Sequence, residues 1–387
     1  MTTPRPASNG VPEHNAYAKA GVDVDIEAQA SRIMYEASKQ TFENRDGRIG
    51  AVVTPFDDFA GLKMISIENL PRGSFMSVGF DTAGTKVEIA QRVGKHDTIA
   101  FDLFAMVCDD AVLRGGEPIL VGTNLDIKSL GTDEKYLPII RELAVGYVDA
   151  AREANVAIIN GEIAQMGTLV SGWGEFPYHW GAACVWVARK EKLFTGAEIK
   201  KGDAVVVLRE NGFRANGWSL VRSVFQKAHG EEWHNFKHGA STLGLLALTP
   251  STIYSRFVVG LHGGFESEGA CDIHGVAHIT GGGIPEKLMR VLRRSGLGAN
   301  LPNLFEPPEI VSHCQKLGSI SDRDAYRAWN MGQGMMLITP EPDKVLAEAK
   351  AYGMEAQIAG EITGEPNITI TSKGVESTGQ RIVFDVQ

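Results

Sequence analysis

The residues with the clearest chemical potential lie in the segment 79–118. Asp81 follows a short apolar run and is itself followed by the sequence Gly84-Thr85-Lys86. Small residues next to a hydroxyl and a lysine form turns whose N–H groups and side chains can bind phosphate oxygens. We therefore expect this turn to lie close to a bound phosphate.

A helix is expected to follow this turn, with Asp97 as its N-cap and a pair of glycines after its last turn. Apolar residues recur at helical spacings along one face: Ile99, Leu103, Met106 and Leu113. Asp110 falls in line with this stripe, while Asp102 and Asp109 fall on the adjacent line. Because an unpaired carboxylate in an apolar environment is costly, Asp110 needs a cation there, and Mg²⁺ carrying a nucleotide phosphate is a common one. The alternative is a hydrogen-bonded core acid or an exposed residue.

The size and charge of the chain limit the classes of protein to which it can belong. A chain of 387 residues is long for a single core and favours two domains. The formal net charge of −9 argues against a nucleic-acid-binding surface. No apolar run approaches the roughly 20 residues of a membrane span, so no membrane partner is expected. Four scattered cysteines without a CxxC pair indicate reduced thiols in a cytoplasmic protein.

Alternating helix and strand patterns predict an α+β fold. The segment 136–155 has the apolar periodicity of an amphipathic helix, and 202–208 is typical of a buried strand. The chain becomes charged and polar just before that strand, which indicates a domain boundary there. The expected parts are a disordered arm over 1–16, an N-terminal domain over 17–192 and a C-terminal domain over 193–387.

Two further motifs carry candidate site residues. Glu162 follows a buried strand, at a position where ligands often approach; the alternative is an ordinary turn residue. Gly281-Gly282-Gly283 open a helix and offer free N–H groups to an anion. His278 precedes these glycines and is a candidate for acid–base catalysis or oxyanion stabilisation. A histidine of the core is the alternative for His278.

The segment 79–118 resembles the nucleotide-binding segment of aminoimidazole ribonucleotide synthetases, also called phosphoribosylformylglycinamidine cyclo-ligases. That family reads roughly Gly-Thr-Asp-Gly-Val-Gly-Thr-Lys, then His-Asp-Thr-Ile-Gly-Ile-Asp-Leu-Val-Ala-Met, then Asn-Asp, then Gly-Ala-Glu-Pro. The matching residues are Asp81, Gly84, Thr85, Lys86, His96, Asp97, Asp102, Asp110, Glu117 and Pro118. The resemblance extends in several motifs over about residues 17–365.

Some of these motifs match only in part. The segment 211–222 resembles the family's His-Ser-Asn-Gly-Tyr-Ser-Leu-Val-Arg and keeps Asn216, but Arg214 stands at the position of the histidine. An arginine can clamp a phosphate through two hydrogen bonds, but it cannot act as a proton shuttle near neutral pH. The family's threonine, second glutamate and proline after Glu162 are replaced by Ile163, Gln165 and Gly167.

The resemblance implies a homodimer in which the strands of the N-terminal domain form a β-barrel with a second subunit, while the C-terminal domain covers the cleft. It implies ATP-dependent ring closure of formylglycinamidine ribonucleotide to aminoimidazole ribonucleotide, in purine synthesis, with ATP and Mg²⁺ as cofactors. Lys19, in a stretch similar to the family's opening Tyr-Lys-Asp-Ala-Gly-Val-Asp, and His278 would serve substrate activation. A solvated lysine in a flexible arm is the alternative for Lys19.

The resemblance also implies which residues contact each ligand. Mg²⁺ would be bound by Asp81, Asp110 and Glu162. The ATP phosphates would lie against Gly84, Thr85, Lys86 and Asp97. The ribose 5-phosphate of the substrate would be held by Arg214, Asn216, Gly281, Gly282 and Gly283.

Two alternatives stay open at this point. Selenophosphate synthetase, thiamine-monophosphate kinase and a hydrogenase-maturation protein share the Asp-rich nucleotide site and differ in the phosphate acceptor. This chain shows no reactive cysteine motif near its N-terminus, which argues against selenophosphate chemistry. The second alternative is a divergent paralogue that binds a nucleotide without catalysis.

Overall fold

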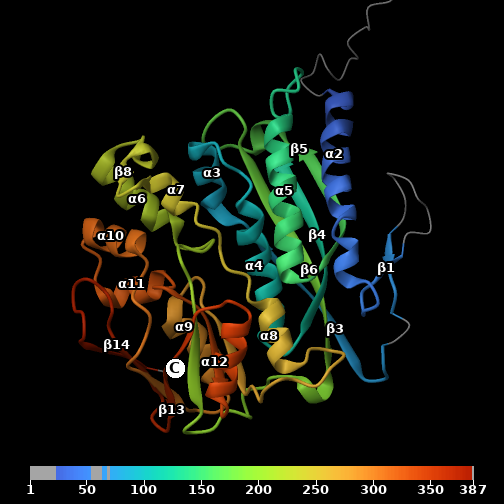
Figure 1. Cartoon of the computed structure of the whole chain (residues 1–387). Helices are drawn as coiled ribbons and strands as arrows, with labels where there is room; N and C mark the ends of the chain where they lie inside the picture. Colours follow the sequence, from blue (N-terminus) through green and yellow to red (C-terminus); the bar gives the residue numbers. More distant parts are fainter. Residues whose placement is uncertain (1–22, 54–62, 68–69, 386–387) are drawn as a thin grey trace, which may run out of the picture.

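The computed structural model describes residues 23–53, 63–67 and 70–385, and Figure 1 shows the helices and strands. The expected N-terminal arm and Lys19 lie outside the described residues. The chain is built on a four-stranded sheet from its first half and a seven-stranded sheet from its second, which gives the expected α+β class. In the described part of the chain, no helix is long and apolar enough to cross a membrane.

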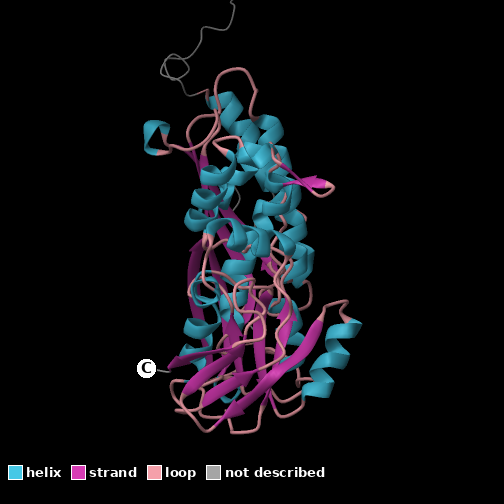
Figure 2. Cartoon of the chain, turned by 90° about the vertical axis from the view of Figure 1, so that its left-hand side faces the viewer, coloured by secondary structure: helices cyan, strands magenta, loops and turns pink. Residues whose placement is uncertain are grey.

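The first sheet has the strand order β3, β6, β4, β5. Its strands are β3 (Ser74–Thr82), β6 (Tyr178–Arg189), β4 (Glu117–Ile127) and β5 (Ala157–Gln165). Only β4 and β5 are parallel, and because parallel neighbours need a crossover, α5 (Leu137–Ala154) connects them. Together with α2 (Val24–Lys39) and α4 (Ile99–Val112), α5 covers one face of the sheet, and Figure 2 shows strands on one side and helices on the other.

Helix α4 lies between the first sheet and the second half of the chain. It contacts β3, β6 and α5, and on its other side α8 (Ser255–His262). Asp102 and Asp109 are completely buried as a result, whereas the side chain of Asp110 in the last turn is 50% exposed. The prediction that Asp110 lies within a buried apolar stripe is therefore wrong. Because neighbours cover this helix on nearly all sides, burial does not follow a single stripe.

The second sheet has the order β10, β12, β7, β13, β11, β14, β15, with only β11 and β14 parallel. Its strands are β7 (Ala204–Arg209), β10 (Gly275–His278), β11 (Gly298–Leu301), β12 (Gln333–Thr339), β13 (Ala356–Thr363), β14 (Asn367–Thr371) and β15 (Arg381–Asp385). The four residues 205–208 of β7 are fully buried and alternate between two apolar clusters. A continuous apolar run therefore forms a strand that is covered on both faces.

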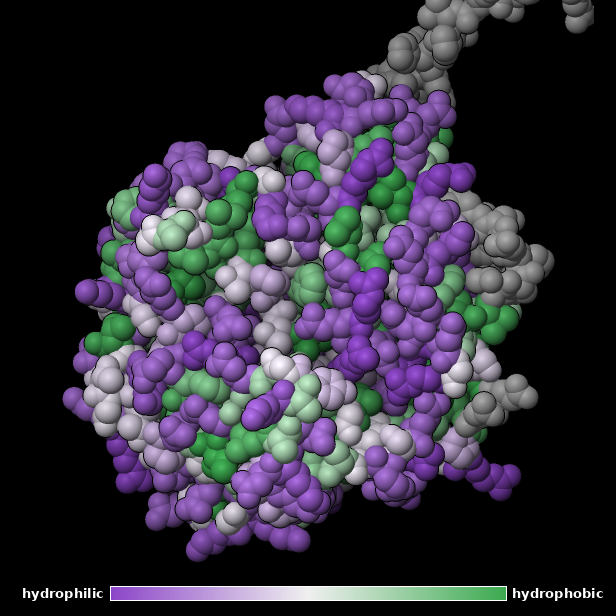
Figure 3. All heavy atoms as spheres, viewed as in Figure 1, coloured by the Kyte–Doolittle hydropathy of each residue, from purple (hydrophilic) through white to green (hydrophobic). Residues whose placement is uncertain are grey.

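The remaining elements are short or surround the second sheet. The helices are α3 (Val87–Val93), α6 (Trp218–His229), α7 (Leu243–Ala247), α9 (Gly283–Leu292), α10 (Glu309–Gly318), α11 (Asp322–Ala328) and α12 (Pro342–Ala351). Two small ribbons pair β1 (Val52–Val53) with β2 (Met64–Ile65) and β8 (Lys237–His238) with β9 (Ser241–Thr242). The view of Figure 3 is mostly hydrophilic, with apolar side chains in separate patches. The main apolar core includes residues of both sheets, so it holds the two halves of the chain in one arrangement.

Candidate functional site

Residues from both halves of the chain meet at the end of β3 and the last turn of α4. Asp81 lies near the end of β3, and Asp110 lies near the end of α4. His278, the last residue of β10, places its Nδ1 2.8 Å from Asp110 Oδ1, although the two residues are 168 positions apart. The glycine turn packs nearby, because a Cβ at Gly84 would lie 2.9 Å from the carbonyl oxygen of Ala215. The structure thus joins four of the motifs found in the sequence.

Asp81 and Asp110 are neighbouring carboxylates with different environments. Burial raises the pKa of Asp81, an N–H from Thr82 lowers it, and the charge of Asp110 raises it again. Burial is the largest influence on Asp110 and acts to raise its pKa, but the hydrogen bond from His278 and the nearby positive charges, Lys287 and Arg214 among them, together lower this pKa below its ordinary value. The pair concentrates negative charge that a bound cation would neutralise.

The donor set at this place fits Mg²⁺ bound together with a nucleotide. Mg²⁺ prefers oxygen ligands and is commonly held by one or two carboxylates, substrate phosphates and water. Asp81 and Asp110 supply two such carboxylates. Among the residues that the structure describes, no group of three histidine, cysteine or acidic side chains could hold a metal ion by itself. Phosphate oxygens would therefore have to complete the coordination.

Lys287 belongs to this cluster and was not predicted from the sequence. It lies on α9, four residues after Gly283, and its positive charge lowers the pKa of both Asp81 and Asp110. Burial and the charge of Arg290 lower the pKa of Lys287 itself. No hydrogen bond or ion pair holds its ammonium group within the described residues. Its place one helical turn after the triple glycine is the signal that could have identified it.

The turn at Gly84 has the expected form. It is a single 3-10 turn, η2 (Gly84–Lys86), that leads into α3. Gly84 has a φ of +60°, a conformation that favours glycine. Thr85 is exposed, and its hydroxyl makes no hydrogen bond within the described part of the chain. Its hydroxyl is thus available to a ligand.

Lys86 does not face this ligand space, contrary to expectation. Its ammonium is completely buried and lies 2.8 Å from Asp102 Oδ1. It also donates to the carbonyl oxygens of Phe213 and Thr249, at 3.1 and 2.7 Å. These three partners use all three of its donors. The prediction that Lys86 contacts the ATP phosphates is therefore wrong. Lys86 instead neutralises a buried acid of α4 and links the two halves of the chain.

Asp97 is a second expected residue that the structure does not bring to the cluster. It precedes α4, whereas Asp110 lies in the last turn of the same helix. At a rise of 1.5 Å per residue, the two are about 20 Å apart. The carboxylate of Asp97 instead forms an ion pair with Lys95 at 2.6 Å.

Glu162 also lies away from the two aspartates. The strand pairing places Glu162, Asn124, Gly181 and Thr82 in one row across the first sheet. Neighbouring strands are about 4.8 Å apart, so Glu162 is about 14 Å from Thr82. Asp81, adjacent to Thr82, points to the opposite face. At this distance Glu162 does not share an ion with Asp81 in one chain. It lines an open cavity of about 670 Å³ that extends across the sheet to Asp81 and Thr82.

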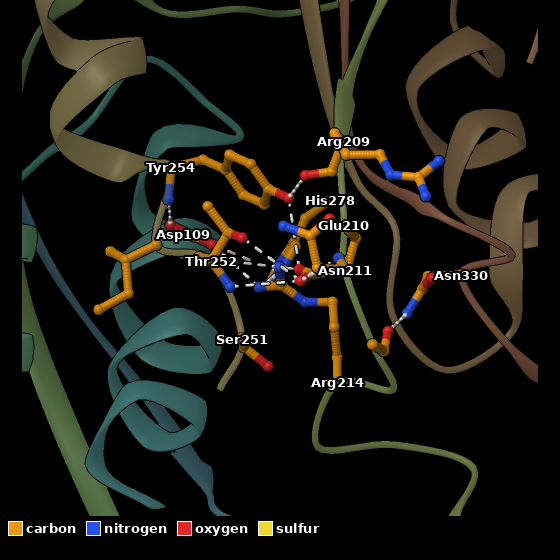
Figure 4. A network of polar contacts seen from close by, with 12 residues as sticks. Asp109, Arg209, Glu210, Asn211, Arg214, Ser251, Thr252, Tyr254, His278 and Asn330 are labelled. Atoms are coloured by element: carbon orange, nitrogen blue, oxygen red, sulfur yellow. Dashed lines mark hydrogen bonds and ion pairs between the residues drawn. The ribbon is translucent and has the colours of Figure 1, made fainter. Parts of the chain in front are cut away.

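Arg214, expected to clamp a substrate phosphate, is instead buried in the ion pairs of Figure 4. Its guanidinium donates to Asp109 Oδ2 at 3.0 Å and to Glu210 Oε2 at 2.5 Å. Burial raises the pKa of Asp109 to about 7 even with Arg214 beside it. Two buried acids that need a counter-charge explain why this arginine points inward. The prediction that Arg214 clamps a substrate phosphate is therefore wrong.

His278 has both ring nitrogens engaged. Nδ1 faces Asp110, and Nε2 lies 2.7 Å from Arg214 Nη2. Burial and the charge of Arg214 lower the pKa of His278 to about 4, so the ring is neutral near pH 7. With both ring nitrogens held by protein partners, His278 presents no free nitrogen to a substrate in this structure. The expected catalytic role is therefore replaced by a contact that holds Asp110.

The triple glycine and Asn216 lie side by side as expected for one binding loop. A Cβ at Gly281 would lie 3.6 Å from the side chain of Asn216, whose Oδ1 is buried without a partner in the described residues. Gly282 and Gly283 have φ values of +91° and +60°. These residues remain candidates for an anion that approaches from the open side of the loop.

Comparison with known proteins gives the family. Residues 57–174 match the N-terminal domain of AIR synthase related proteins, and residues 200–373 match their C-terminal domain. The chain is 32% identical to the phosphoribosylformylglycinamidine cyclo-ligase of Lachnoclostridium phytofermentans over 92% of its own length and 99% of that protein. This chain belongs to the phosphoribosylformylglycinamidine cyclo-ligase family. The cyclo-ligase of Thermococcus kodakarensis is 30% identical over 93% of this chain and 99% of that protein.

Solved structures share the fold of this cyclo-ligase family member at low sequence identity. Thiamine-monophosphate kinase from Stenotrophomonas maltophilia matches with a TM-score of 0.57 at 14% identity, over 90% of this chain and 97% of that one. The hydrogenase maturation protein HypE in complex with ATP matches with a TM-score of 0.52 at 15% identity, over 81% and 85%. These likenesses establish the architecture and not the acceptor.

Proposed function

We propose that this protein catalyses the ATP-dependent ring closure of formylglycinamidine ribonucleotide. The formyl amide oxygen takes the γ-phosphoryl group of ATP, which releases ADP and converts a poor electrophile into an iminophosphate. The amidine nitrogen of the same molecule attacks the activated carbon and loses a proton. Phosphate then leaves with the former amide oxygen, and aminoimidazole ribonucleotide is formed.

One observation supports this proposal above the others: Asp81 and Asp110 come from separate motifs of a cyclo-ligase family member and lie together. In the proposal they bind Mg²⁺, which when bound would neutralise the charge on the transferring phosphoryl group. Thr85 and the turn at Gly84 lie along the phosphates, and Lys287 faces the same charge. The protein's main task is to position the amide oxygen against the γ-phosphate.

The proposed site lies between two proposed domains, 17–192 and 193–387. Asp81 and Asp110 belong to the first, whereas Lys287 and the triple glycine belong to the second. The ribonucleotide would then bind between them, with its phosphate near Asn216 and Gly281. Closing such a cleft excludes water from an activated intermediate that water would hydrolyse.

We further propose a homodimer built on β3, an edge strand of the first sheet. Edge strands present unpaired N–H and C=O groups that a second chain can use. Met76, Val78 and Phe80 alternate on one face of β3 and are 66, 47 and 77% exposed. A row of exposed apolar side chains is typical of a surface that a partner covers. The barrel shared between two subunits, implied by the resemblance, would cover this row.

We also propose a cytoplasmic location. All four cysteines are buried and free. Buried thiols that form no disulfide are typical of a reducing compartment.

The proposed function is tested by incubating the purified full chain with Mg²⁺ and ATP, with and without formylglycinamidine ribonucleotide. We expect ADP and aminoimidazole ribonucleotide only when the substrate is present. Asp110→Asn should lower the rate by about a hundredfold or more, because it removes a charge from the metal and phosphate site. Asp149→Asn, on the exposed side of α5, is the matched control and should leave the rate unchanged. Nucleotide binding without substrate-dependent turnover would contradict the proposal and point to another acceptor.

A further inference from the structure

Arg214 lies at the centre of a buried polar network (Figure 4). Through His278 this network reaches Asp110 of the proposed nucleotide site. Arg214 donates to Asp109 and Glu210 and lies 2.7 Å from His278 Nε2. A further donor contact reaches the carbonyl oxygen of Thr252 at 3.1 Å. The four side chains of the network are buried, so water does not replace these contacts. The network therefore has a single arrangement of donors and acceptors.

This arrangement determines which nitrogen of His278 carries the proton. A guanidinium has only donors and stays charged, so the Nε2 atom that faces Arg214 must accept. The proton of the neutral ring is then on Nδ1, which lies 2.8 Å from Asp110 Oδ1. His278 accepts from Arg214 on one side and donates to Asp110 on the other.

The chain departs from the cyclo-ligase motifs at two positions of this network at once. The motifs have asparagine where this chain has Asp109 and histidine where it has Arg214. In the structure these two residues are partners in an ion pair of 3.0 Å, with side chains 0 and 2% exposed. Because an isolated buried charge is costly, either change alone would be unfavourable. The two changes are therefore expected to depend on one another.

The carboxylate of Asp109 is also fixed by the backbone. Its Oδ1 accepts N–H groups from Tyr254 and Ser255, at 2.9 and 2.8 Å, at the start of α8. Glu210 holds the other side of the guanidinium. Arg214 is thus positioned by two elements besides its own, which leaves it little freedom to move away from His278.

We propose that Arg214 is a positioning residue: anchored by Asp109 and Glu210, it fixes His278 in the tautomer that donates to Asp110 and so directs Asp110 toward the bound metal and phosphates. The inference rests on the proposed function in one respect, because that function assigns Asp110 to Mg²⁺. The tautomer and the dependence of Asp109 and Arg214 on one another do not rest on it.

The tautomer is measured by NMR on the full chain labelled with ¹⁵N in its histidines. The signal of His278 is identified by its absence in His278→Asn. We expect the proton on Nδ1 in the wild type and in Arg214→Lys, whose side chain also only donates. Arg214→Gln can both donate and accept, so there only the carboxylate of Asp110 favours the proton on Nδ1, and a fraction of the ring should carry it on Nε2 instead. A proton on Nε2 of His278 in the wild type would overturn the proposal, whatever the activity of the protein.

The dependence of Asp109 and Arg214 on one another is measured with Asp109→Asn, Arg214→His and the double variant. The measurements are kinetics with formylglycinamidine ribonucleotide and thermal unfolding. Each single change should lower kcat about 10- to 100-fold, the usual effect of losing an outer contact of a metal ligand, with a smaller change in KM for the ribonucleotide. The double variant should recover at least about tenfold of that loss and unfold at a higher temperature than either single variant. Losses that simply multiply in the double variant would overturn the proposal.

Three comparisons separate the possible failures. Arg152→Gln, an exposed arginine of α5, controls for the loss of an arginine as such. If the single variants do not fold, Arg214→Lys and the double variant still report on kcat and on the tautomer. A wild type without turnover contradicts the proposed function, whereas active protein with unaffected single variants contradicts the role of Arg214.

Discussion

Asp81, Asp110 and Lys287 share one small region, and their charges determine what can bind there. The charge of Asp110 raises the pKa of Asp81, because it disfavours the ionised form of its neighbour. Lys287 offsets part of this repulsion, and a magnesium ion would offset the rest. A ligand that brings phosphate oxygens together with a divalent cation satisfies all three groups. An anion without a metal would meet two negative charges and is expected to bind weakly.

Lys287→Met should raise the KM for ATP with Mg²⁺ by about tenfold, because a charged contact to phosphate oxygens is lost. Lys287→Arg should retain most of the affinity, since it keeps the positive charge. Steady-state kinetics with varied ATP measures the effect. Arg290→Met, on the same helix but exposed and paired with Glu286, is the control. An unchanged KM in Lys287→Met would show that Lys287 does not face the nucleotide.

His96 gives a prediction about stability and pH. Burial lowers its pKa to about 4, compared with 6.5 in an unfolded chain. Between these values the unfolded chain takes up a proton and the folded protein does not. The stabilisation is therefore complete above about pH 6.5 and is lost as the pH falls toward 4, by up to about 3 kcal/mol. Urea unfolding of the wild type and of His96→Gln at several pH values tests this. The same dependence of the free energy of unfolding on pH in both proteins would contradict it.

At the scale of elements, the loop between β10 and α9 fixes where the second half of the chain contributes to the site. Gly283 has a φ of +60°, and a Cβ there would lie 1.8 Å from the carbonyl oxygen of Tyr326. The close approach of this loop to the end of α11 sets the direction of α9. The position of Lys287 one turn later follows from it.

Gly283→Ala should destabilise the fold by about 2 to 3 kcal/mol more than a glycine substitution in open space. Gly296→Ala is the matched control, because Gly296 has a φ of +66° and a Cβ added there would meet no atom within 4 Å. It should lose only about 1 kcal/mol, from the left-handed conformation itself. Urea unfolding of both variants measures the difference. Equal losses would mean that the loop relaxes away from Tyr326.

The sequence was most informative where structure depends on nearby residues. The helix expected to end before the glycine pair ends at Val112, and the amphipathic pattern over 136–155 corresponds to α5, Leu137–Ala154. Glycines and apolar periodicity are local signals, so they place elements well. The expected N-cap Asp97 was wrong, because Thr98 precedes α4 and no side chain caps this helix. The family resemblance then predicted the fold and the meeting of Asp81 and Asp110 in one site.

The direction of charged side chains could not be predicted in the same way. Lys86 and Arg214 were expected at phosphates, yet both point into the interior. Their partners Asp102 and Asp109 lie 16 and 105 positions away, and both acids are covered by α8 and the segment just before it, which hydrogen-bond to them. Burial that depends on distant elements leaves no periodic signal in the sequence. Lys287 was missed for the related reason that its neighbours Asp81 and Asp110 are distant in sequence.

At the scale of the whole molecule, the proposed dimer depends on the exposed face of the first sheet. Phe80→Lys should weaken the proposed dimer, because it places a charge in the apolar row along β3. Sedimentation of the full chain at several concentrations should then show monomer where the wild type is dimer. Val145→Lys changes an exposed apolar residue on the helix-covered side and should leave the dimer intact. A wild type that is monomeric at all concentrations would contradict the assembly.

The path of the amide oxygen tests the central claim most directly. Formylglycinamidine ribonucleotide labelled with ¹⁸O at the formyl oxygen is converted by the full-length protein with ATP and Mg²⁺, and the inorganic phosphate is examined by mass spectrometry. The proposed reaction transfers that oxygen to phosphate as the ring closes, so the phosphate should carry the label. Aminoimidazole ribonucleotide formed with unlabelled phosphate would contradict activation of the amide oxygen by ATP, and with it the chemistry assigned to this site.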